Sequence, residues 1–239
     1  HVITIDSDVS RERLADARFA FVGTDNLVGG IELGVTAKGI RTAGGKYVTF
    51  VGIKSSQNAM ERIGGFKEGA GEGFTSLDSM GDEVDPSRAR ENVRNAIKNH
   101  PDLNTLVGIW SYNAPAIVDV VRELNRRKDF AIVTFDAEPT AVDEMAKGNI
   151  DAMVVQNPYE MGYQGIRTLK ALAEGDEVTV KEIYPKLGEP DGNLFDTGLK
   201  VVVPDEGSPL TAEMFGPKTQ FMKLGAFREW LAKYNLKGS

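Results

Sequence analysis

The chain has 239 residues, of which 41 % are hydrophobic and 26 % charged, a balance typical of a globular protein that buries a sizeable core. The absence of cysteine excludes disulfides, thiolate nucleophiles and zinc–thiolate sites. The net charge of -7 argues against a nucleic-acid partner, which requires a basic face, and no apolar run approaches the roughly 20 residues that cross a bilayer.

Short apolar strands that end in polar or aromatic residues recur along the chain. Apolar, β-branched runs of this length are typical of strands buried in a parallel sheet, and such sheets bind ligands at the carboxyl ends of their strands. We therefore expect one concave site assembled from several loops. The five expected strands cover residues 2–5, 47–51, 105–109, 130–135 and 152–155.

Helices are predicted between these strands from apolar spacing and from cap residues. The clearest start is Asp85-Pro86, an N-cap followed by proline at the first helical position. Alternation of strand and helix predicts right-handed crossovers and a parallel sheet. The expected helices cover residues 27–41, 59–70, 86–99, 115–127, 140–147, 158–173 and 221–234, and further strands are expected at 19–22, 74–80, 178–184 and 199–203.

Familiar catalytic and cofactor motifs are missing from the sequence. Residues 23–30 lack the Gly-Lys-Ser/Thr ending of a phosphate loop, and no Gly-x-Gly-x-x-Gly opens a helix after a strand. His1 and His100 are the only histidines, so neither a catalytic triad nor a histidine metal cluster is available. We expect no metal and no cofactor. Asp6 with Asp136 as an acid/base pair stays open as a hydrolase alternative.

The residues at strand ends and helix starts match the needs of a polyol ligand. Sugar hydroxyls both donate and accept hydrogen bonds, so a sugar site uses carboxylates, a guanidinium, amides and an aromatic face. Each residue alone has an ordinary structural reading, such as a helix cap for Asp136, a surface ion pair for Arg62 or core packing for Trp110. The candidate set is Asp6, Asn58, Arg62, Trp110, Asn113, Asp136 and Gln156.

These residues lie in stretches that together resemble the periplasmic sugar-binding proteins of the ribose/galactose type. Those proteins are solute receptors of ABC transporters, and their ligand domain is shared by LacI-type repressors. No single motif is diagnostic, but the order of the motifs is. The stretches are Val2–Asp8, Phe21–Asn26 with Gly29-Gly30, Gln57–Phe66, Asn99–Asp102, Trp110–Pro115, Phe135–Ala137, Gln156–Tyr163 and Asp196–Gly198.

The resemblance implies an α/β fold of the periplasmic binding protein type I, with two lobes of parallel sheet and helices joined by three crossovers. An N-terminal lobe would comprise residues 1–24 and 157–197, and a C-terminal lobe residues 25–156 and 198–239. It places ligand positions on Asp6, Arg62, Asp136 and Gln156, with Trp110 or Asn113 nearby. Ser7 replaces an arginine common in the family, which leaves Asp8 as a substitute ligand. The loop Trp110–Asn113 looks more like the glucose- and xylose-type members.

The resemblance also implies that about three strand-helix units of the N-terminal lobe, roughly 80 residues, precede His1 in the complete protein. The expected function is that of a non-enzymatic, monomeric, periplasmic receptor that closes on a monosaccharide and delivers it to the permease of an ABC transporter. The alternatives are the effector domain of a LacI-type repressor and the receptor of a sugar chemosensory system.

Overall fold

The computed structural model describes residues 1–10 and 17–239 and divides the chain into two compact units. Unit 1 contains residues 1–25 and 156–198, and unit 2 contains residues 26–155 and 199–239. The backbone passes between the units three times, after Asp25, Val155 and Gly198. Within the described ranges, no helix combines the length and the apolar character needed to cross a membrane.

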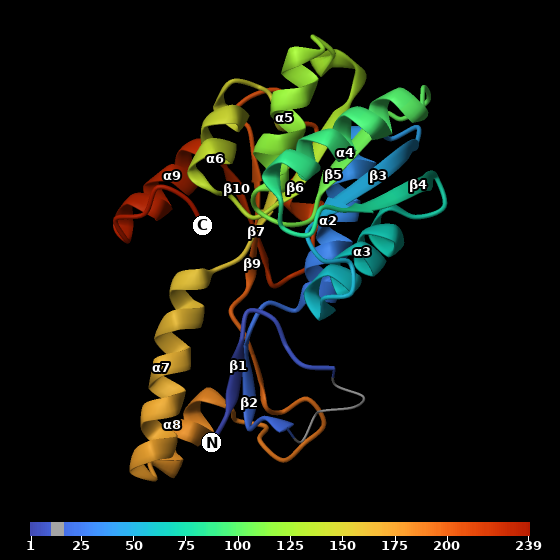
Figure 1. Ribbon diagram of the computed structural model, residues 1–239. Helices are drawn as coiled ribbons and strands as arrows, with labels where there is room; N and C mark the ends of the chain where they lie inside the picture. The colour runs from blue at the N-terminus through green and yellow to red at the C-terminus, as the bar shows by residue number, and fades with distance from the viewer. Residues whose placement is uncertain (11–16) are drawn as a thin grey trace. The chain divides into compact units, whose positions relative to one another are not determined.

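Unit 2, all of whose residues are described, is built around a seven-stranded sheet in the order β10-β9-β7-β6-β5-β3-β4 (Figure 1). Strands β7 and β9 are antiparallel, and every other neighbouring pair is parallel. The strands are β3 (Gly45–Val51), β4 (Phe74–Gly81), β5 (Thr105–Gly108), β6 (Ala131–Phe135), β7 (Ala152–Val155), β9 (Leu199–Val203) and β10 (Thr219–Lys223).

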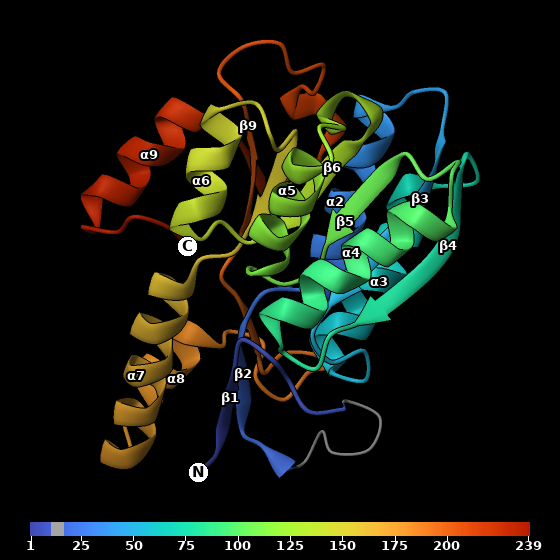
Figure 2. The same cartoon turned by 45° about the horizontal axis from the view of Figure 1, so that its top comes forward.

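Helices cover both faces of this sheet, because alternate side chains of the buried strands point to opposite faces. One apolar cluster joins Val107, Val133 and Val154 to helices α2 (Asn26–Ile40) and α3 (Gln57–Ala70). A second cluster joins Leu106, Ile132 and Met153 to the helices of the other face (Figure 2). Those helices are α4 (Pro86–Asn99), α5 (Asn113–Glu123), α6 (Pro139–Ala146) and α9 (Leu224–Lys233). Two 3-10 turns, Arg127–Asp129 and Ala212–Met214, complete the unit.

The described part of unit 1 has a three-stranded parallel sheet in the order β1-β2-β8. Its helices α7 and α8 pack beside each other, and α7 contacts β1 and β2. Ala20, Val22, Val180 and Tyr184 belong to its small apolar core. The elements are β1 (Ile3–Ile5), β2 (Ala20–Gly23), β8 (Leu194–Asp196), α7 (Pro158–Glu174) and α8 (Glu177–Ile183).

Most predicted elements are confirmed, but the expected strand over residues 178–184 is wrong. The chain forms helix α8 there, because Asp176 caps the helix by accepting hydrogen bonds from the Thr179 amide at 3.1 Å and its hydroxyl at 2.7 Å. Val180 and Ile183, three residues apart, are buried, whereas the Val178 side chain is 79 % exposed. Helical spacing and a cap thus override the strand preference of the β-branched residues.

Two further differences lie at the C-terminal end of unit 2. The predicted helix over residues 221–234 begins only at Leu224, because residues 219–223 form strand β10. The predicted parallel sheet is confirmed except at this edge, where β9 returns antiparallel to β7. Strand β9 enters unit 2 directly from unit 1 after Gly198, so it is not preceded by a crossover helix that would make it parallel.

Candidate functional site

Arg62 is placed by an unusually close contact between helices α2 and α3. A Cβ atom on Gly30 would lie 2.3 Å from the Arg62 carbonyl oxygen, and one on Gly65 would lie 2.3 Å from the Leu27 carbonyl oxygen. Only glycine allows backbone to meet backbone at this separation. The glycines of the two helices therefore set how closely α3, and with it Arg62, lies against α2.

The Arg62 side chain is 1 % exposed and is held by several groups of unit 2. Its Nε donates to Asn26 Oδ1 at 2.8 Å, and its Nη1 donates to the Ile109 carbonyl at 3.1 Å. The guanidinium carbon lies 3.8 Å from the centroid of the Phe135 ring, a cation–π contact. These contacts fix the orientation of a planar donor at the carboxyl ends of β5 and β6.

Asp136 lies beside this guanidinium, with 3.8 Å between Asp136 Oδ2 and Arg62 Nη1. Its side chain is 16 % exposed, and its amide donates to the Val154 carbonyl at 2.8 Å. The residue has a φ of 65°, a left-handed conformation that Asp tolerates better than most residues. Burial and the neighbouring negative charge of Asp136 together raise the pKa of Glu138. The edge of the sheet thus holds a buried cation and a partly accessible carboxylate side by side.

Two buried polar atoms have no hydrogen-bond partner among the described residues and belong to residues close in the chain to Arg62 or to its partner Ile109: Asn58 Oδ1 and Trp110 Nε1. Asn58 lies one turn before Arg62 on α3, and Trp110 directly follows Ile109, which accepts from Arg62. An unpaired buried polar group costs about 1–3 kcal/mol, so native proteins usually pair it. A ligand with hydroxyl groups supplies both kinds of partner, because a hydroxyl donates to Asn58 Oδ1 and accepts from Trp110 Nε1.

The loop after β5 is held by a carboxylate that the sequence analysis did not select. Asp82, fully buried at the end of β4, accepts from the Tyr112 hydroxyl and from Asn113 Nδ2 at 3.0 Å. Asn113 Oδ1 accepts from the Trp110 amide at 3.0 Å, so both ends of the Asn113 amide are used inside the protein. Burial and the Asp82 carboxylate raise the pKa of the Tyr112 hydroxyl. Asn113 thus supports the loop that presents Trp110.

The three remaining candidates belong to unit 1. Asp6 is exposed, has a φ of 67°, and its amide donates to the Val22 carbonyl at 3.1 Å, while Gln156 is buried. Asp8 accepts from Arg18 Nε at 2.7 Å and from Arg18 Nη2 at 2.5 Å, and both side chains are at most 4 % exposed. Arg18 therefore already pairs with the Asp8 carboxylate, which the sequence suggested as a substitute ligand.

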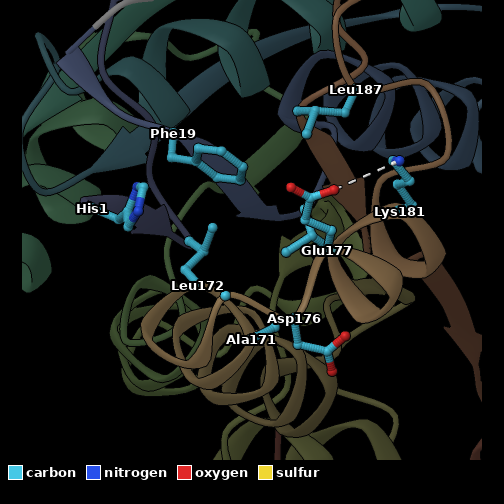
Figure 3. Close-up of a pocket in the computed structure, with 10 residues that line it drawn as sticks. His1, Phe19, Ala171, Leu172, Asp176, Glu177, Lys181 and Leu187 are labelled. Carbon is cyan, nitrogen blue, oxygen red and sulfur yellow. Dashed lines mark ion pairs between the residues drawn. The ribbon is translucent and has the colours of Figure 1, made fainter.

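Unit 1 also contains a separate cavity of about 350 Å³, which none of the predicted site residues lines (Figure 3). Phe19, Leu172, Val180 and Leu187 make its lining mainly apolar, and the Glu177–Lys181 ion pair lies at 4.0 Å. His1 and Phe19 precede β1 and β2, so the cavity lies at the amino ends of these strands. Ligands of open α/β sheets bind at the opposite, carboxyl ends. We therefore do not regard this cavity as the main site.

Of the residues predicted from the sequence, the structure places Arg62 beside Asp136, and their role as ligand contacts stays a prediction. The sequence analysis did not select Asn26, which accepts from Arg62, or Asp82. Asp82 carries the same signal as Asp136, a carboxylate directly after a strand, and this signal could have found it. Asn26 gave only a cap signal at a helix start. Within residues 1–10 and 17–239, no group of three His, Cys, Asp or Glu residues is arranged to hold a metal ion.

A family model described as "Periplasmic binding protein domain" matches residues 1–177. Among curated proteins, the ribose import binding protein RbsB of Escherichia coli (strain K12) is 25 % identical over 187 residues. The match covers 77 % of this chain and 60 % of that protein. The chain therefore spans well under two thirds of the length of this relative.

Two solved structures share the fold at 26 % sequence identity. The glucose-galactose binding protein GanP from Geobacillus stearothermophilus gives a TM-score of 0.73, with 84 % of this chain and 67 % of that chain covered. An ABC transporter solute-binding protein from Burkholderia graminis C4D1M, solved in complex with D-arabinose, gives 0.70, with 85 % and 67 % covered.

Proposed function

The chain belongs to the periplasmic binding protein family, and we propose that it is the ligand-binding part of a monosaccharide receptor for an ABC transporter, not an enzyme. The observation that carries this proposal is the cluster at the carboxyl ends of β5 and β6. There the Arg62 guanidinium lies 3.8 Å from the Asp136 carboxylate. Two buried atoms without a hydrogen-bond partner, Asn58 Oδ1 and Trp110 Nε1, belong to the residue one turn before Arg62 and to the residue after Ile109, which accepts from Arg62.

The chemistry of the cluster favours a neutral polyol over other small ligands. Asp136 and Asn58 Oδ1 accept hydrogen bonds, while Arg62 and Trp110 Nε1 donate them, so the cluster matches hydroxyl groups that do both. An anionic ligand would be repelled by Asp136, and an apolar ligand would leave the polar atoms unpaired. The names of the similar proteins, which state ribose, glucose-galactose and D-arabinose, agree with a pentose or hexose.

We propose further that the two units act as lobes that close on the sugar, with Asp6 and Gln156 as the contribution of unit 1. The closed form would present the surface that a membrane permease recognises, and the complete protein would work as a monomer in the periplasm. The chain alone spans about 60 % of its curated relative, so this statement concerns the complete protein.

The test is a calorimetric titration of the complete protein against D-ribose, D-xylose, D-arabinose, D-glucose and D-galactose. We expect saturable binding of one or two of these sugars and no turnover of the matching aryl glycosides. X-ray scattering with the bound sugar would show a smaller radius of gyration if the lobes close. Binding of none of the sugars by the folded protein would contradict the proposal, and turnover would move it to the hydrolase alternative with Asp6 and Asp136.

Transport is tested separately from binding, because a repressor or a chemosensory receptor would use the same sugar site. We expect the sugar-loaded protein to stimulate ATP hydrolysis by its transporter in proteoliposomes. Sugar binding without stimulation of any co-encoded permease would leave the site intact and replace the transport role by a sensory one.

A further inference from the structure

The turn between β6 and α6 takes its hydrogen bonds from a distant segment. Ala137 is fully buried; its amide donates to the Ser239 carbonyl, and its carbonyl accepts from the Ser239 amide, both at 2.7 Å. Pro139 opens α6 and has no amide hydrogen, and Glu138 makes no side-chain cap bond. The buried backbone groups of Ala137 are therefore satisfied by residue 239, which lies more than one hundred positions away in sequence.

The segment after α9 is shaped to reach this turn. Asn235 has a φ of 54°, which reverses the chain at the end of the helix, and the Leu236 amide donates to the Leu231 carbonyl at 3.0 Å. Leu236 packs against the core cluster that contains Phe227 and Leu231. In both overall views the letter C, which marks the last residue drawn, lies beside α6 (Figures 1 and 2). Packing of α9 thus determines where residues 238 and 239 lie.

Gly238 brings this segment into backbone contact with the turn. A Cβ atom at this position would lie 2.6 Å from the Ala137 carbonyl oxygen and 2.7 Å from Pro139 Cδ. The neighbouring atoms are backbone and a proline ring, which cannot move aside as a flexible side chain would. Glycine at position 238 is therefore a condition for the paired hydrogen bonds between Ala137 and Ser239.

We infer that Gly238 and Ser239 form a clamp that positions the sugar-binding carboxylate of Asp136. Asp136 has the left-handed conformation, and its own amide is fixed on one side by Val154. The peptide between Asp136 and Ala137 is fixed by the Ala137 amide, and the following peptide is fixed by the Ala137 carbonyl. Without the clamp, the buried groups of Ala137 lose their partners and the turn rearranges, which moves Asp136 relative to Arg62. The inference rests on the proposed function, because it assigns the clamp to that site.

The first test compares Gly238→Ala with Gly64→Ala in the complete protein, using the sugar that binds most tightly in the panel. Each variant adds one methyl group, but Gly64 has open space around it. We expect Gly238→Ala to weaken sugar affinity about tenfold, the size of effect expected when buried hydrogen bonds are lost, and Gly64→Ala to leave it unchanged. Equal affinities of the two variants would contradict the clamp.

A double-mutant cycle of Gly238 and Asp136 shows whether the clamp acts on affinity by positioning Asp136 or by stabilising the fold as a whole. In an Asp136→Asn background, which keeps a side chain that tolerates the left-handed φ, Gly238→Ala should change affinity by less than about twofold, because the carboxylate that the clamp positions is gone. A tenfold loss in both backgrounds would mean that the segment acts on the fold as a whole. Ser239→Pro replaces Gly238→Ala if that variant does not fold; it removes the amide that donates to Ala137 and puts a ring carbon against the Ala137 carbonyl, so a loss of affinity at least as large is expected.

A measurement on the sugar-free protein tests the clamp even if the protein binds no sugar. In nuclear magnetic resonance spectra of the free protein, we expect a slowly exchanging Ala137 amide. Gly238→Ala should accelerate this exchange and shift the Asp136 amide and Arg62 Nε signals, whereas Gly64→Ala should not. Unshifted Asp136 and Arg62 signals in Gly238→Ala would overturn the inference, whatever the sugar titrations show. Binding of no sugar by the wild-type protein would overturn the assignment of the clamp to a sugar site.

Discussion

Asp6 in unit 1 and Asp136 in unit 2 occupy the same place in two different sheets. Each directly follows a strand, has a φ of 65–67°, and donates its amide to a carbonyl of the next strand along the chain, Val22 or Val154. Each of those next strands leads to a point where the backbone leaves its unit. The same backbone arrangement thus presents a carboxylate twice, each time beside the strand that leads into a crossover.

The surroundings of the two carboxylates differ. Asp136 lies 3.8 Å from a buried arginine that is itself fixed by Asn26, Ile109 and Phe135, whereas Asp6 is exposed. Unit 2 has large apolar clusters on both faces of its sheet, whereas the described part of unit 1 has a small cluster and the buried Asp8–Arg18 pair. In unit 2 the residues of the proposed site are therefore fixed by the protein itself, whereas the Asp6 carboxylate of unit 1 has no such support among the contacts of the described residues.

The largest expected effect is on the stability of unit 1. Asp8→Ala leaves the Arg18 guanidinium buried without its carboxylate, which should cost about 3–5 kcal/mol. Glu123→Ala, which removes the half-exposed partner of Arg94, should cost at most about 1 kcal/mol. Both tryptophans lie in unit 2. Asp8→Ala should therefore lower the unfolding transition seen by circular dichroism more than the one seen by tryptophan fluorescence, and coincident shifts would contradict the comparison.

The Asp8–Arg18 pair also predicts that the stability of unit 1 falls at acidic pH. Burial raises the pKa of Asp8, but hydrogen bonds from Arg18 and Thr4 outweigh it and hold the pKa below the ordinary 3.8. A carboxyl whose pKa is lower in the folded state contributes stability above its ordinary pKa and loses this contribution as the pH falls through the folded value. Wild-type unit 1 should lose stability below about pH 4, and Asp8→Ala should lose less over the same range.

The next largest effect is expected for sugar binding at unit 2. Arg62→Lys keeps the positive charge but loses the planar fork and the contact with Phe135, so affinity should fall about 10- to 100-fold. Arg94→Lys, an exchange at an exposed ion pair, is the matched control and should leave affinity unchanged. Calorimetric titrations measure both. An unaffected Arg62→Lys variant would mean that the buried arginine is only structural.

A smaller loss of sugar affinity is expected when helices α2 and α3 are pushed apart. Gly30→Ala places a methyl group 2.3 Å from the Arg62 carbonyl oxygen, so the helices must separate and Arg62 must shift. We expect a loss of affinity of several-fold, roughly 1 kcal/mol, because the interaction is weakened but not removed. Gly64→Ala on the exposed side of α3 should not change it. If both variants bind sugar like the wild type, the spacing of α2 and α3 does not control the site.

The smallest expected effect is on the stability of unit 2 at alkaline pH and comes from Lys200. This residue is 4 % exposed, and its Nζ lies 4.0 Å from the centroid of the Trp230 ring. Burial lowers the pKa of Lys200 from 10.5 to about 8. Between these values the unfolded chain holds a proton that the folded chain has lost, so stability rises with pH from about 8 to 10.5.

Lys200→Met should abolish this rise and stabilise the protein at pH 7 on the order of 1 kcal/mol, since the charged form is no longer buried but the contact with Trp230 is lost. Melting temperatures at pH 7 and pH 10 measure the difference, with the exposed Lys98→Met as control. A rise of the same size in Lys200→Met and in the wild type would assign it to other groups.

Much of unit 2 could be predicted from the sequence, because its strands are short apolar runs and its helices have clear starts such as Asp85-Pro86. The candidate residues Arg62 and Asp136 followed from their places beside these elements. The helix over residues 177–183 could not be predicted, because its β-branched residues favour a strand until the Asp176 cap and the core are in place. Asp82 directly follows strand β4, and this local signal could have selected it, but its partners Tyr112 and Asn113 lie about 30 residues away. The role of Gly238 depends on contacts between residues far apart in sequence, which no local pattern shows.

The central claim, that the carboxyl ends of β5 and β6 bind a sugar, is tested most directly by tryptophan fluorescence. Trp110 lies next to the site, whereas Trp230 packs against the cluster on the other face of the sheet. In the complete protein, titration with the sugar that binds most tightly should give a saturable change that Trp110→Phe abolishes and Trp230→Phe preserves. A saturable change that persists in Trp110→Phe and disappears in Trp230→Phe would place the ligand away from this cluster and contradict the account.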